Sequence, residues 1–577
     1  MADALWLGFI HWGELMNQDD TQAAALQAQA YPIAQPPKGP YPEQSIPRYN
    51  AAKGMWAACF SGGGPRAFAA SLGQMRGLQA AGVVPLLGAI SCVSGGSWFG
   101  GLFSYAPSSY SDQQLLGPVV APGDLTVAML DQLPSGYLGS ALGHLSNEEL
   151  AAWLALYLLE YKWGTIPFDK IWGRLLNATL LSPFGLGDLN TSLTLNQQTL
   201  AAIEARNPSL NANFFTLRKD RPFFIAGATL VYPQNTLSPQ GDFVRSYPAR
   251  DHALLRTQPR LEPGDLPGQT YRPFEYTPGY SGTPQLFAGA GVNGVDIGNG
   301  YVENFAFDTP TPRGVNSSDI VTVAAGQFPF LLSDVIGSSS AALASLIDLS
   351  GYSGGFPYFQ YWPIRKIGQQ ASASYSFGDG GILENIGIVP LLRRKYRVIF
   401  AFVNSPFPIN ATDKGCVDGI DGQISRLFGF IPANDYGSNQ NTQIFDKTEF
   451  AGLAAGLKSA RAAGEAVVHA GYYAVLPNNP FALESYTPLI FWLYNDLNES
   501  WRHRLPPAVS ALLNDTDPQD FLANFPNYAT VGQNYEELLY LTPRQINLLA
   551  HMWCDTMVQG FAAQGQAFGM DLPGPAG

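Results

Sequence analysis

Two short apolar segments near the start of the chain give the first predicted elements. Residues 55–60 and 86–92 contain no charged residue, and each run ends close to glycines. Continuous apolar runs of this length are typical of strands buried on both faces of a parallel sheet. Between them, residues 66–81 carry apolar side chains at helical spacing, namely Phe68, Leu72, Met75 and Leu78. The pattern predicts a strand–helix–strand unit with a glycine-rich turn after each strand.

The rest of the chain continues this alternation. Apolar runs at 222–231, 396–403 and 489–493 predict further core strands. Helices are predicted at 146–161, 168–180, 382–392, 450–463 and 542–561. Strands that alternate with helices indicate the α/β class, so we expect a central, mostly parallel sheet with helices on both faces.

The chain divides into an arm, a core with an insertion, and a C-terminal region. Its 577 residues exceed what one hydrophobic core usually supports. We expect an N-terminal arm at 1–50 and a catalytic core at 51–405, with a largely helical cap inserted at about 112–232. Residues 406–577 are predicted to form a helical elaboration packed on the core.

The arm is expected to change character along its length. Residues 21–30 predict a short helix, whereas six prolines within residues 32–47 favour an extended strap. Proline lacks the main-chain N–H that a helix interior requires, so the helix should end before the strap begins.

The clearest helix of the cap begins at Ser146. Glu149 follows three residues later, which is the pattern of a capping box. One face then carries Trp153, Leu154, Tyr157, Leu158 and Tyr161. This face either packs on the core or faces a lipid surface as a lid, and we favour packing on the core.

Charge and cysteine content narrow the partners. With 32 basic and 45 acidic residues the net charge is −13, which argues against nucleic acid and against general electrostatic adhesion to an anionic membrane. Cysteines show no metal-ligand spacing, so we expect neither a metal nor another cofactor. Cys59 and Cys92, at the ends of neighbouring predicted strands, are expected to be buried free thiols, with a disulfide as the alternative.

Targeting signals are weak. The first residues have no basic flank and soon reach Glu14, so a cleaved signal peptide is not expected. The uncharged run at 77–111 is broken by Pro85 and several glycines, which favours a buried sheet region over a membrane span. We expect a cytoplasmic or peripheral membrane location, with export without a cleaved signal left open.

The turn after the second predicted strand has the shape of a nucleophile elbow. Ser94 is followed by Gly95 and Gly96, and such a sharp strand-to-helix turn needs small neighbours because backbone approaches backbone. Cys92 stands where many elbows have glycine. The turn after the first strand contains Gly62, Gly63 and Gly64, whose N–H groups can point at one anion, either a phosphate or an oxyanion.

A serine hydroxyl also needs a base. Asp379 lies at a predicted strand-to-helix junction, followed by Gly380 and Gly381, at the sheet edge expected for the elbow. The alternative is a Ser-Asp-His triad, for which His469 has the right chain order. His469 ends an alanine-rich stretch that is predicted to be helical and has no glycine-rich loop around it, so we interpret it as structural and favour a serine–aspartate dyad.

These motifs resemble those of a known family. Ser-Gly-Gly-Gly-Pro-Arg-Ala at 61–67, Val-Ser-Gly-Gly-Ser-Trp at 93–98, and Asp379-Gly380-Gly381 with Asn385 and Pro390 are similar to the catalytic domain of cytosolic phospholipase A2 and fungal lysophospholipase (phospholipase B), within the patatin-like superfamily. Weaker echoes are Trp-Gly-Arg at 172–174, Phe-Glu-Tyr-Thr-Pro at 274–278 and the serine run at 338–340. The resemblance covers about residues 53–405.

The resemblance implies a patatin-like acyl hydrolase fold and a specific site. Ser94 and Asp379 would form the catalytic dyad, and the N–H groups of the Gly62–Gly64 turn, chiefly Gly63 and Gly64, would form the oxyanion hole. Arg66 would contact the substrate phosphate, with an ion pair to a carboxylate as its alternative role.

The leading expectation is a lipid acyl hydrolase that cleaves carboxylic esters of phospholipids or lysophospholipids through an acyl-enzyme. Transfer of the acyl group to an alcohol by the same dyad is an alternative, and a catalytically inactive lipid-binding protein is another. Transient contact with a membrane surface is consistent with each of them. The sequence does not set the oligomeric state.

Overall fold

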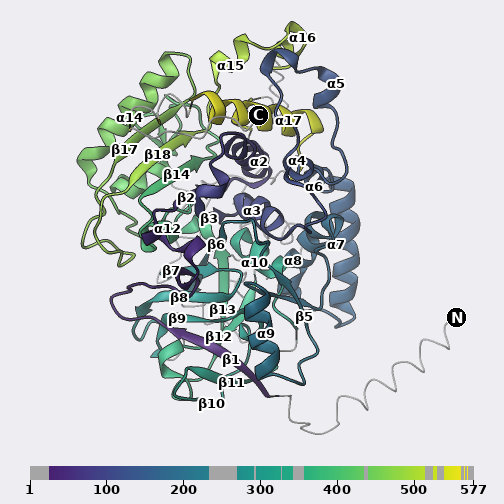
Figure 1. Ribbon diagram of the computed structural model, residues 1–577, viewed down its shortest axis with the longest axis vertical. Helices are drawn as coiled ribbons and strands as arrows, with labels where there is room; N and C mark the ends of the chain where they lie inside the picture. The colour runs from purple at the N-terminus through teal and green to yellow at the C-terminus, as the bar shows by residue number, and fades with distance from the viewer. Residues whose placement is uncertain are drawn as a thin grey trace, which may run out of the picture.

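Five parallel strands form the centre of the structure, a computed structural model (Figure 1). It describes residues 25–232, 270–291, 294–325, 328–341, 357–433, 440–513, 524–528 and 539–560, with 565 and 568. The parallel strands lie in the order β6-β3-β2-β14-β18. Their bounds are β2 Trp56–Phe60, β3 Leu87–Val93, β6 Phe223–Tyr232, β14 Val398–Val403 and β18 Leu489–Tyr494. The predicted α/β class with a parallel central sheet is confirmed.

The chain reverses its direction of winding at β2. It adds β3 and β6 on one side of β2, then returns to place β14 and β18 on the other. In open α/β sheets, ligands bind at the carboxyl ends of the strands where this reversal occurs. Residues 61–64 follow β2 at that position, which puts the glycine-rich turn at the favoured place in the fold.

Antiparallel strands extend the sheet on both sides. Beyond β6 lie β7 (Thr270–Tyr276), β8 (Tyr280–Phe287), β9 (Ile297–Glu303), β1 (Ala25–Pro32), β11 (Ile320–Ala324) and β10 (Gly314–Val315). On the other edge, β17 (Val468–Tyr472) pairs with β18. The hairpin of β12 (Tyr358–Tyr361) and β13 (Ala373–Asp379) joins through β6. The central sheet thus takes strands from both sides of position 405.

The helix predicted at 21–30 is wrong over its described part. Residues 21–24 lie outside the described residues, and from Ala25 the chain forms β1, which pairs with β9 and β11. Leu26, Ala28 and Ala30 alternate with polar residues and are buried. This period of two is the pattern of a strand with one buried face, although alanine and glutamine favour helix locally.

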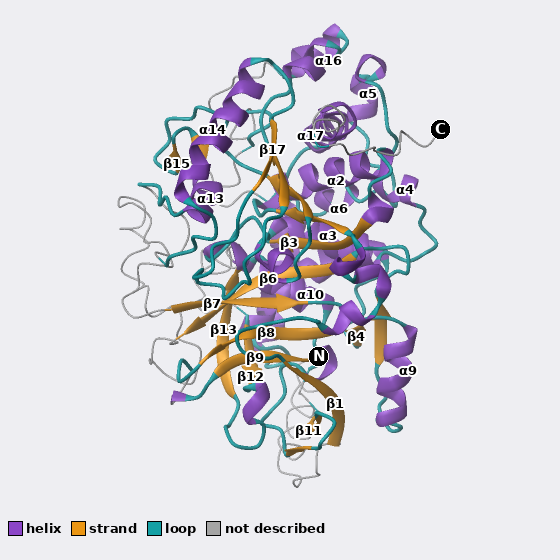
Figure 2. Cartoon of the chain, turned by 60° about the vertical axis from the view of Figure 1, so that its left-hand side comes forward, coloured by secondary structure: helices purple, strands orange, loops and turns teal. Residues whose placement is uncertain are grey.

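Helices cover the sheet on two sides. Figure 2 shows α13 (Gly422–Ser425) and α14 (Lys447–Ala462) on one side of β17, with α2 (Gly64–Ala80) and α17 (Pro543–Asp555) on the other. α3 (Gly95–Tyr105) packs on α2, and α10 (Leu332–Ser339) packs on α3. The remaining C-terminal elements are β15 (Cys416–Val417), β16 (Ile420–Asp421), α15 (Glu499–His503) and α16 (Pro507–Leu512).

The helix predicted at 382–392 is much shorter in the structure. A single turn follows Asp379, and α12 runs only over Val389–Arg393. Gly387 has a positive φ of 78°, which breaks helical geometry. The Glu384 carboxylate accepts hydrogen bonds from the N–H groups of Ile386, Gly387 and Val389 instead.

The segment expected to form the cap contains a series of short helices and one long one. They are α4 (Asp112–Leu116), α5 (Val127–Leu130), α6 (Ser140–Gly143), α7 (Asn147–Lys162), α8 (Ile171–Leu176) and α9 (Gln197–Arg206). Ser146 caps α7 by accepting a hydrogen bond from the Glu149 N–H, which is one half of the predicted capping box. The Glu149 carboxylate lies 3.2 Å from His144 Nδ1 and does not complete the box. A two-stranded parallel sheet of β4 (Thr191–Thr194) and β5 (Asn213–Thr216), which the pattern did not indicate, also lies here.

A buried ion pair fastens the strap of the arm to the core. Glu43, in a short turn of helix, is fully buried and lies 2.6 Å from Arg394 Nε, at the end of α12. Arg394 Nη1 also lies 3.0 Å from Glu275 Oε2, on β7. The cluster of Glu43, Arg394 and Glu275 therefore joins three distant parts of the chain.

The cysteines of the central strands and the lengths of the helices can be compared with the expectations from the sequence. Cys59 and Cys92 are buried free thiols, as expected, and burial raises the pKa of both. Among the described helices, none combines the length and apolar character needed to cross a membrane.

Candidate functional site

Ser94 occupies a strained turn between β3 and α3. Its φ of 52° and ψ of −126° lie outside the regions that side chains usually adopt. Its N–H donates to both the carbonyl and the hydroxyl oxygen of Ser339, at 3.2 and 3.1 Å. Its carbonyl accepts from the Ser97 N–H at 2.8 Å, which starts α3. Strain held by such contacts is typical of a nucleophile elbow.

The glycines after Ser94 are required by close backbone contacts. A Cβ on Gly95 would lie 2.0 Å from the Gly64 carbonyl oxygen, and one on Gly96 would lie 2.5 Å from the Phe60 carbonyl oxygen. Both distances are too short for any side chain. The start of α3 therefore packs directly on the turn that follows β2.

Cys92 fits the elbow because the helix opposite it lacks a side chain. A Cβ on Gly100 of α3 would lie 2.6 Å from Cys92 Sγ. Because Gly100 has no side chain, the Cys92 side chain has space between β3 and α3. The departure from the usual elbow pattern leaves the turn geometry intact.

Asp379 reaches the elbow because two strands meet end to end on the same edge of β6. β3 runs parallel to β6 and ends with Val93 opposite Gly227. β13 runs antiparallel to β6 from the other direction and ends with Asp379 opposite Ala228. Since β7 occupies the other edge of β6, the ends of β3 and β13 are next to each other. Residues 94 and 379 are neighbours for this reason.

Ser94 and Asp379 form a hydrogen-bonded pair. Ser94 Oγ donates to Asp379 Oδ2 at 2.8 Å. Asp379 Oδ1 accepts from the Gly381 N–H at 2.7 Å, and its carbonyl accepts from Thr229 Oγ1 at 2.9 Å. Both side chains are nearly buried, with 7% of Ser94 and 4% of Asp379 exposed. The carboxylate is thus held with one oxygen directed at the hydroxyl.

The absence of side chains at Gly380 and Gly381 allows the Asp379 carboxylate and the loop after it to pack closely. A Cβ on Gly380 would lie 2.4 Å from the Gly227 carbonyl oxygen, and one on Gly381 would lie 3.0 Å from Asp379 Oδ1. The loop after Asp379 therefore passes close to β6 and to the carboxylate itself.

The glycine-rich turn lies against the dyad. A Cβ on Gly62 would lie 2.9 Å from Ser94 Cβ. Gly63 and Gly64 have φ values of 136° and 55°, which glycine adopts without strain. The Gly62 N–H donates to the Asn385 carbonyl at 3.0 Å, whereas the N–H groups of Gly63 and Gly64 donate to no other residue in the part of the chain that the structure describes. Two donors therefore remain beside Ser94.

Arg66 is buried beneath this turn. Its Nε donates to the Asn404 carbonyl at 3.2 Å, and its Nη1 donates to the Tyr528 carbonyl. Nη2 lies against Gly63, 2.6 Å from the position of a Cβ there. Burial lowers the pKa of the Arg66 guanidinium to about 10, and the nearby Asp421 carboxylate opposes this shift. Arg66 is charged at neutral pH, and its hydrogen bonds join the first turn of α2 to the main chain at Asn404 and Tyr528.

Two residues at the site were not assigned a role from the sequence. Ser339 binds the Ser94 N–H and donates to the Gly227 carbonyl at 2.7 Å. Asn385 accepts from the Gly62 N–H, and its side chain lies against Gly62 and Gly381. The serine run at 338–340 was the only sequence signal for the first, and position 385 within the third motif for the second.

His469 lies far from the dyad. It sits on β17 and not at the end of a helix, so the predicted helical context is wrong. β17 is four strands from β3 in the sheet, or about 19 Å at the usual strand spacing. A triad of Ser94, Asp379 and His469 does not form. No group of three or more His, Cys, Asp or Glu side chains in the described residues is arranged to hold a metal.

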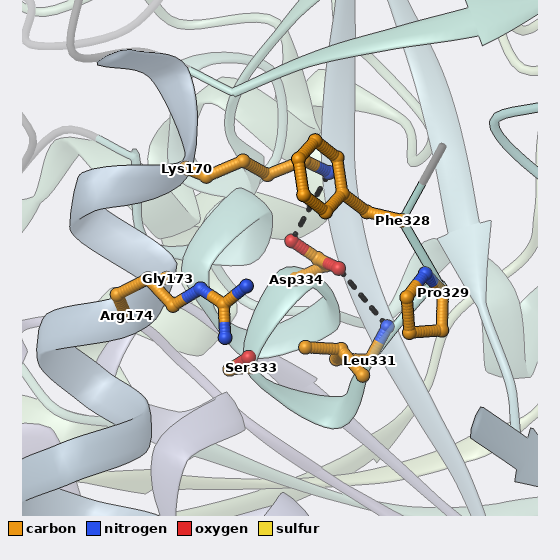
Figure 3. Close-up of a pocket in the computed structure, with 8 residues that line it drawn as sticks. All are labelled: Lys170, Gly173, Arg174, Phe328, Pro329, Leu331, Ser333 and Asp334. Atoms are coloured by element: carbon orange, nitrogen blue, oxygen red, sulfur yellow. Dashed lines mark hydrogen bonds and ion pairs between the residues drawn. The ribbon is translucent and has the colours of Figure 1, made fainter. Parts of the chain in front are cut away.

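A pocket also lies at the opposite end of α10 from Ser339 (Figure 3). Lys170 Nζ lies 3.4 Å from Asp334 Oδ1, and the other carboxylate oxygen accepts from the Leu331 N–H at 3.0 Å. Arg174 and Ser333 complete the polar part of its wall. Because α10 is eight residues long, or about 12 Å, this pocket is separate from the dyad.

Comparison with known proteins supports the resemblance. No protein-family model matches the chain. A stretch of 206 residues is 27% identical to lysophospholipase 1 of Candida albicans, and the match covers 34% of this chain and 33% of the relative. The predicted similarity to lysophospholipases is confirmed. The chain spans about a third of the length of the curated relative it matches.

Solved structures of human GIVD cytosolic phospholipase A2 are also similar. One covers 95% of this chain and 66% of its own, with 13% identity and a TM-score of 0.46. Another, in complex with methyl gamma-linolenyl fluorophosphonate, covers 92% of this chain and 64% of its own, with 13% identity and a TM-score of 0.41.

Proposed function

We propose that this protein is a lipid acyl hydrolase that cleaves carboxylic esters of phospholipids or lysophospholipids. The observation that carries the proposal is the hydrogen bond from Ser94 Oγ to Asp379 Oδ2 beside the N–H groups of Gly63 and Gly64, which have no acceptor among the described residues. A nucleophile, a base and two oxyanion donors in one place are the requirements of acyl transfer. The matched Candida protein is named a lysophospholipase, which supports the choice of substrate class.

Each residue has a defined part in the proposed reaction. Asp379 accepts the Ser94 hydroxyl proton as the oxygen attacks the ester carbonyl carbon. The N–H groups of Gly63 and Gly64 stabilise the oxyanion, and Asp379 returns the proton to the departing alcohol. Water then gives a proton to Asp379 and attacks the acyl-enzyme carbonyl. Asp379 passes this proton to Ser94 Oγ as the ester bond breaks, which releases the fatty acid and restores the serine hydroxyl.

Arg66 has only part of its guanidinium group available for a substrate phosphate. Two of its guanidinium nitrogens are engaged by main-chain carbonyls. Contact with a substrate phosphate would therefore involve Nη2, which faces Gly63. Its hydrogen bonds make it a residue that positions the start of α2, next to the glycine-rich turn.

The test is fatty-acid release from lysophosphatidylcholine by variants of the dyad. Ser94→Ala removes the nucleophile and Asp379→Asn removes the base, so each should reduce the rate by about 10²-fold or more. His469→Ala, four strands away, serves as the control and should retain the wild-type rate. Wild-type release by either dyad variant would refute the proposal. A fluorophosphonate probe should label the wild type and leave Ser94→Ala unlabelled.

A further inference from the structure

The middle part of α7, a helix at the surface, is apolar on all sides. Residues 150–159 contain no charged side chain. Leu150, Leu154 and Leu158 pack against the core, as expected for the inner face of a helix. The outer face of such a helix is normally polar, whereas here it carries alanine, leucine and tryptophan. The outer face therefore has apolar surface that the rest of the described chain does not cover.

Four exposed apolar residues lie on one side of α7, with Glu160 among them. Trp153, Leu156, Leu159 and Trp163 are 36, 40, 45 and 69% exposed. Their spacing of three and four residues places them within roughly 120° of the helix circumference. We call these four residues the α7 stripe. With Tyr161, this segment holds five of the twelve large hydrophobic residues that are exposed in the described part of the chain.

The stripe lies on the outside of the helical layer that supports the elbow. In Figure 1, α7 runs along the outer edge of the molecule, with α8 between it and α10. α8 and α10 approach closely, since a Cβ on Gly337 would lie 3.3 Å from Gly173 Cα. α10 ends at Ser339, which binds the Ser94 N–H. A surface that contacts α7 is thus connected to the site through two packed helices.

We propose that the α7 stripe docks the protein on the surface of neutral or zwitterionic lipid aggregates. This inference rests on the proposed function, because an enzyme that cleaves lipid esters must meet its substrate at a lipid–water interface. The 16 residues of α7 span about 24 Å, too short to cross a bilayer. The helix therefore lies along the interface with its stripe inserted.

The chemistry of the stripe favours lipid over protein as the partner. Two of its four residues are tryptophan, whose amphipathic ring is enriched at lipid–water interfaces. The four residues are uncharged, but Glu160 lies within their arc of the helix. α7 also bears Glu148 and Glu149 and has a single cation, Lys162. The whole chain carries a net charge of −13. Apolar insertion and not charge attraction drives the docking, so anionic lipid weakens it.

The experiment compares two triple variants of the full chain. The stripe variant carries Leu156→Gln, Leu159→Gln and Trp163→Gln. The control carries Val119→Gln, Ile431→Gln and Tyr472→Gln, which removes exposed apolar residues elsewhere on the surface. Flotation with phosphatidylcholine vesicles measures binding. The stripe variant should bind about tenfold more weakly or worse than wild type, and the control should bind as wild type does. High salt should leave wild-type binding unchanged, and adding phosphatidylglycerol should reduce it.

Two further measurements separate the possible causes. Hydrolysis of a soluble, monomeric short-chain ester should be equal in wild type and both triple variants, which shows that the fold is retained. Ser94→Ala should bind vesicles as wild type does, so failure of the proposed function and failure of docking are distinguishable. Undiminished vesicle binding by the stripe variant would overturn the proposal. Self-association of the wild type that the stripe variant abolishes, without vesicle binding, would also overturn it and assign the stripe to a dimer interface.

Discussion

At position 95 there is no space for a side chain, and the obstructing atom belongs to the backbone. A Cβ there would lie 2.0 Å from the Gly64 carbonyl oxygen, which cannot rotate away. Gly95→Ala should therefore push α3 from the glycine-rich turn and displace Ser94. We expect fatty-acid release to fall by about 10²-fold and the free energy of unfolding to fall by about 1–3 kcal/mol.

The matched control is Gly452→Ala in α14, where a Cβ would meet nothing within 4 Å. Alanine favours helix, so this variant should be up to about 1 kcal/mol more stable in urea unfolding and fully active. Equal activity of the two glycine variants would show that the contact between positions 64 and 95 does not set the elbow.

Local residue patterns predicted the elbow and the glycine-rich turn, but not the residues that hold Ser94 and Arg66 in place. The elbow and the glycine-rich turn follow from small residues at short spacing, and their contacts are between adjacent turns. Ser339 lies 245 positions from Ser94, and a serine in a serine run has no local feature that reveals such a partner. The main-chain carbonyls that hold Arg66 are equally invisible, because any residue can supply them.

Among the elements, α2 and α17 are joined by contacts that depend on glycine and on a neutral histidine. A Cβ on Gly73 of α2 would lie 2.3 Å from the Ala550 carbonyl oxygen of α17. Arg76 Nη1 lies 3.2 Å from His551 Nδ1. Burial, with the charge of Arg76, lowers the pKa of His551 from 6.5 to about 3. The imidazole is therefore an acceptor that must remain unprotonated in the folded protein.

This contact predicts a pH dependence of stability. Because the folded-state pKa of His551 is depressed, its stabilising contribution is complete above about pH 6.5 and is lost as pH falls from there toward 3. Each pH unit in this window should cost about 1.4 kcal/mol. His551→Gln keeps an acceptor for Arg76 without titrating. Denaturant unfolding at several pH values should show the wild type losing about 2 kcal/mol relative to this variant between pH 6.5 and 5. Parallel curves for the two proteins would contradict the assignment.

Among the strands, those that the sequence predicted correctly are buried on both faces of the sheet. β2, β3, β14 and β18 are continuous apolar runs, and their burial follows from composition alone. β1 was predicted as a helix because the local propensity of alanine and glutamine opposes its period of two. No local pattern predicts that β13 runs antiparallel to β6, because this depends on which edge of β6 is free after β3 ends.

At the scale of the whole molecule, the Glu43–Arg394–Glu275 cluster connects the strap, α12 and β7. Removing one member leaves a buried charge without its partner, which is more costly than loss of an exposed pair. Glu43→Ala should lower the free energy of unfolding by about 3 kcal/mol. Urea unfolding followed by fluorescence measures this, and one transition is expected because the cluster joins distant segments.

Lys395→Ala is the matched control for this change. Lys395 is adjacent to Arg394 and pairs with Glu484 at 2.6 Å, but both side chains are partly exposed to solvent. Its loss should cost less than about 1 kcal/mol. Equal costs for the two variants would mean that the strap is not fastened by its buried pair.

The meeting of β3 and β13 on one edge of β6 also bears on how the protein is made. Ser94 is synthesised 285 positions before Asp379. The elbow therefore leaves the ribosome long before the last residue of β13 has been added. Until that strand has docked, the hydroxyl has no acceptor for its proton. A nascent chain, or one truncated before residue 379, would therefore carry the Ser94 hydroxyl without its base, and the dyad would form only after β13 has paired with β6.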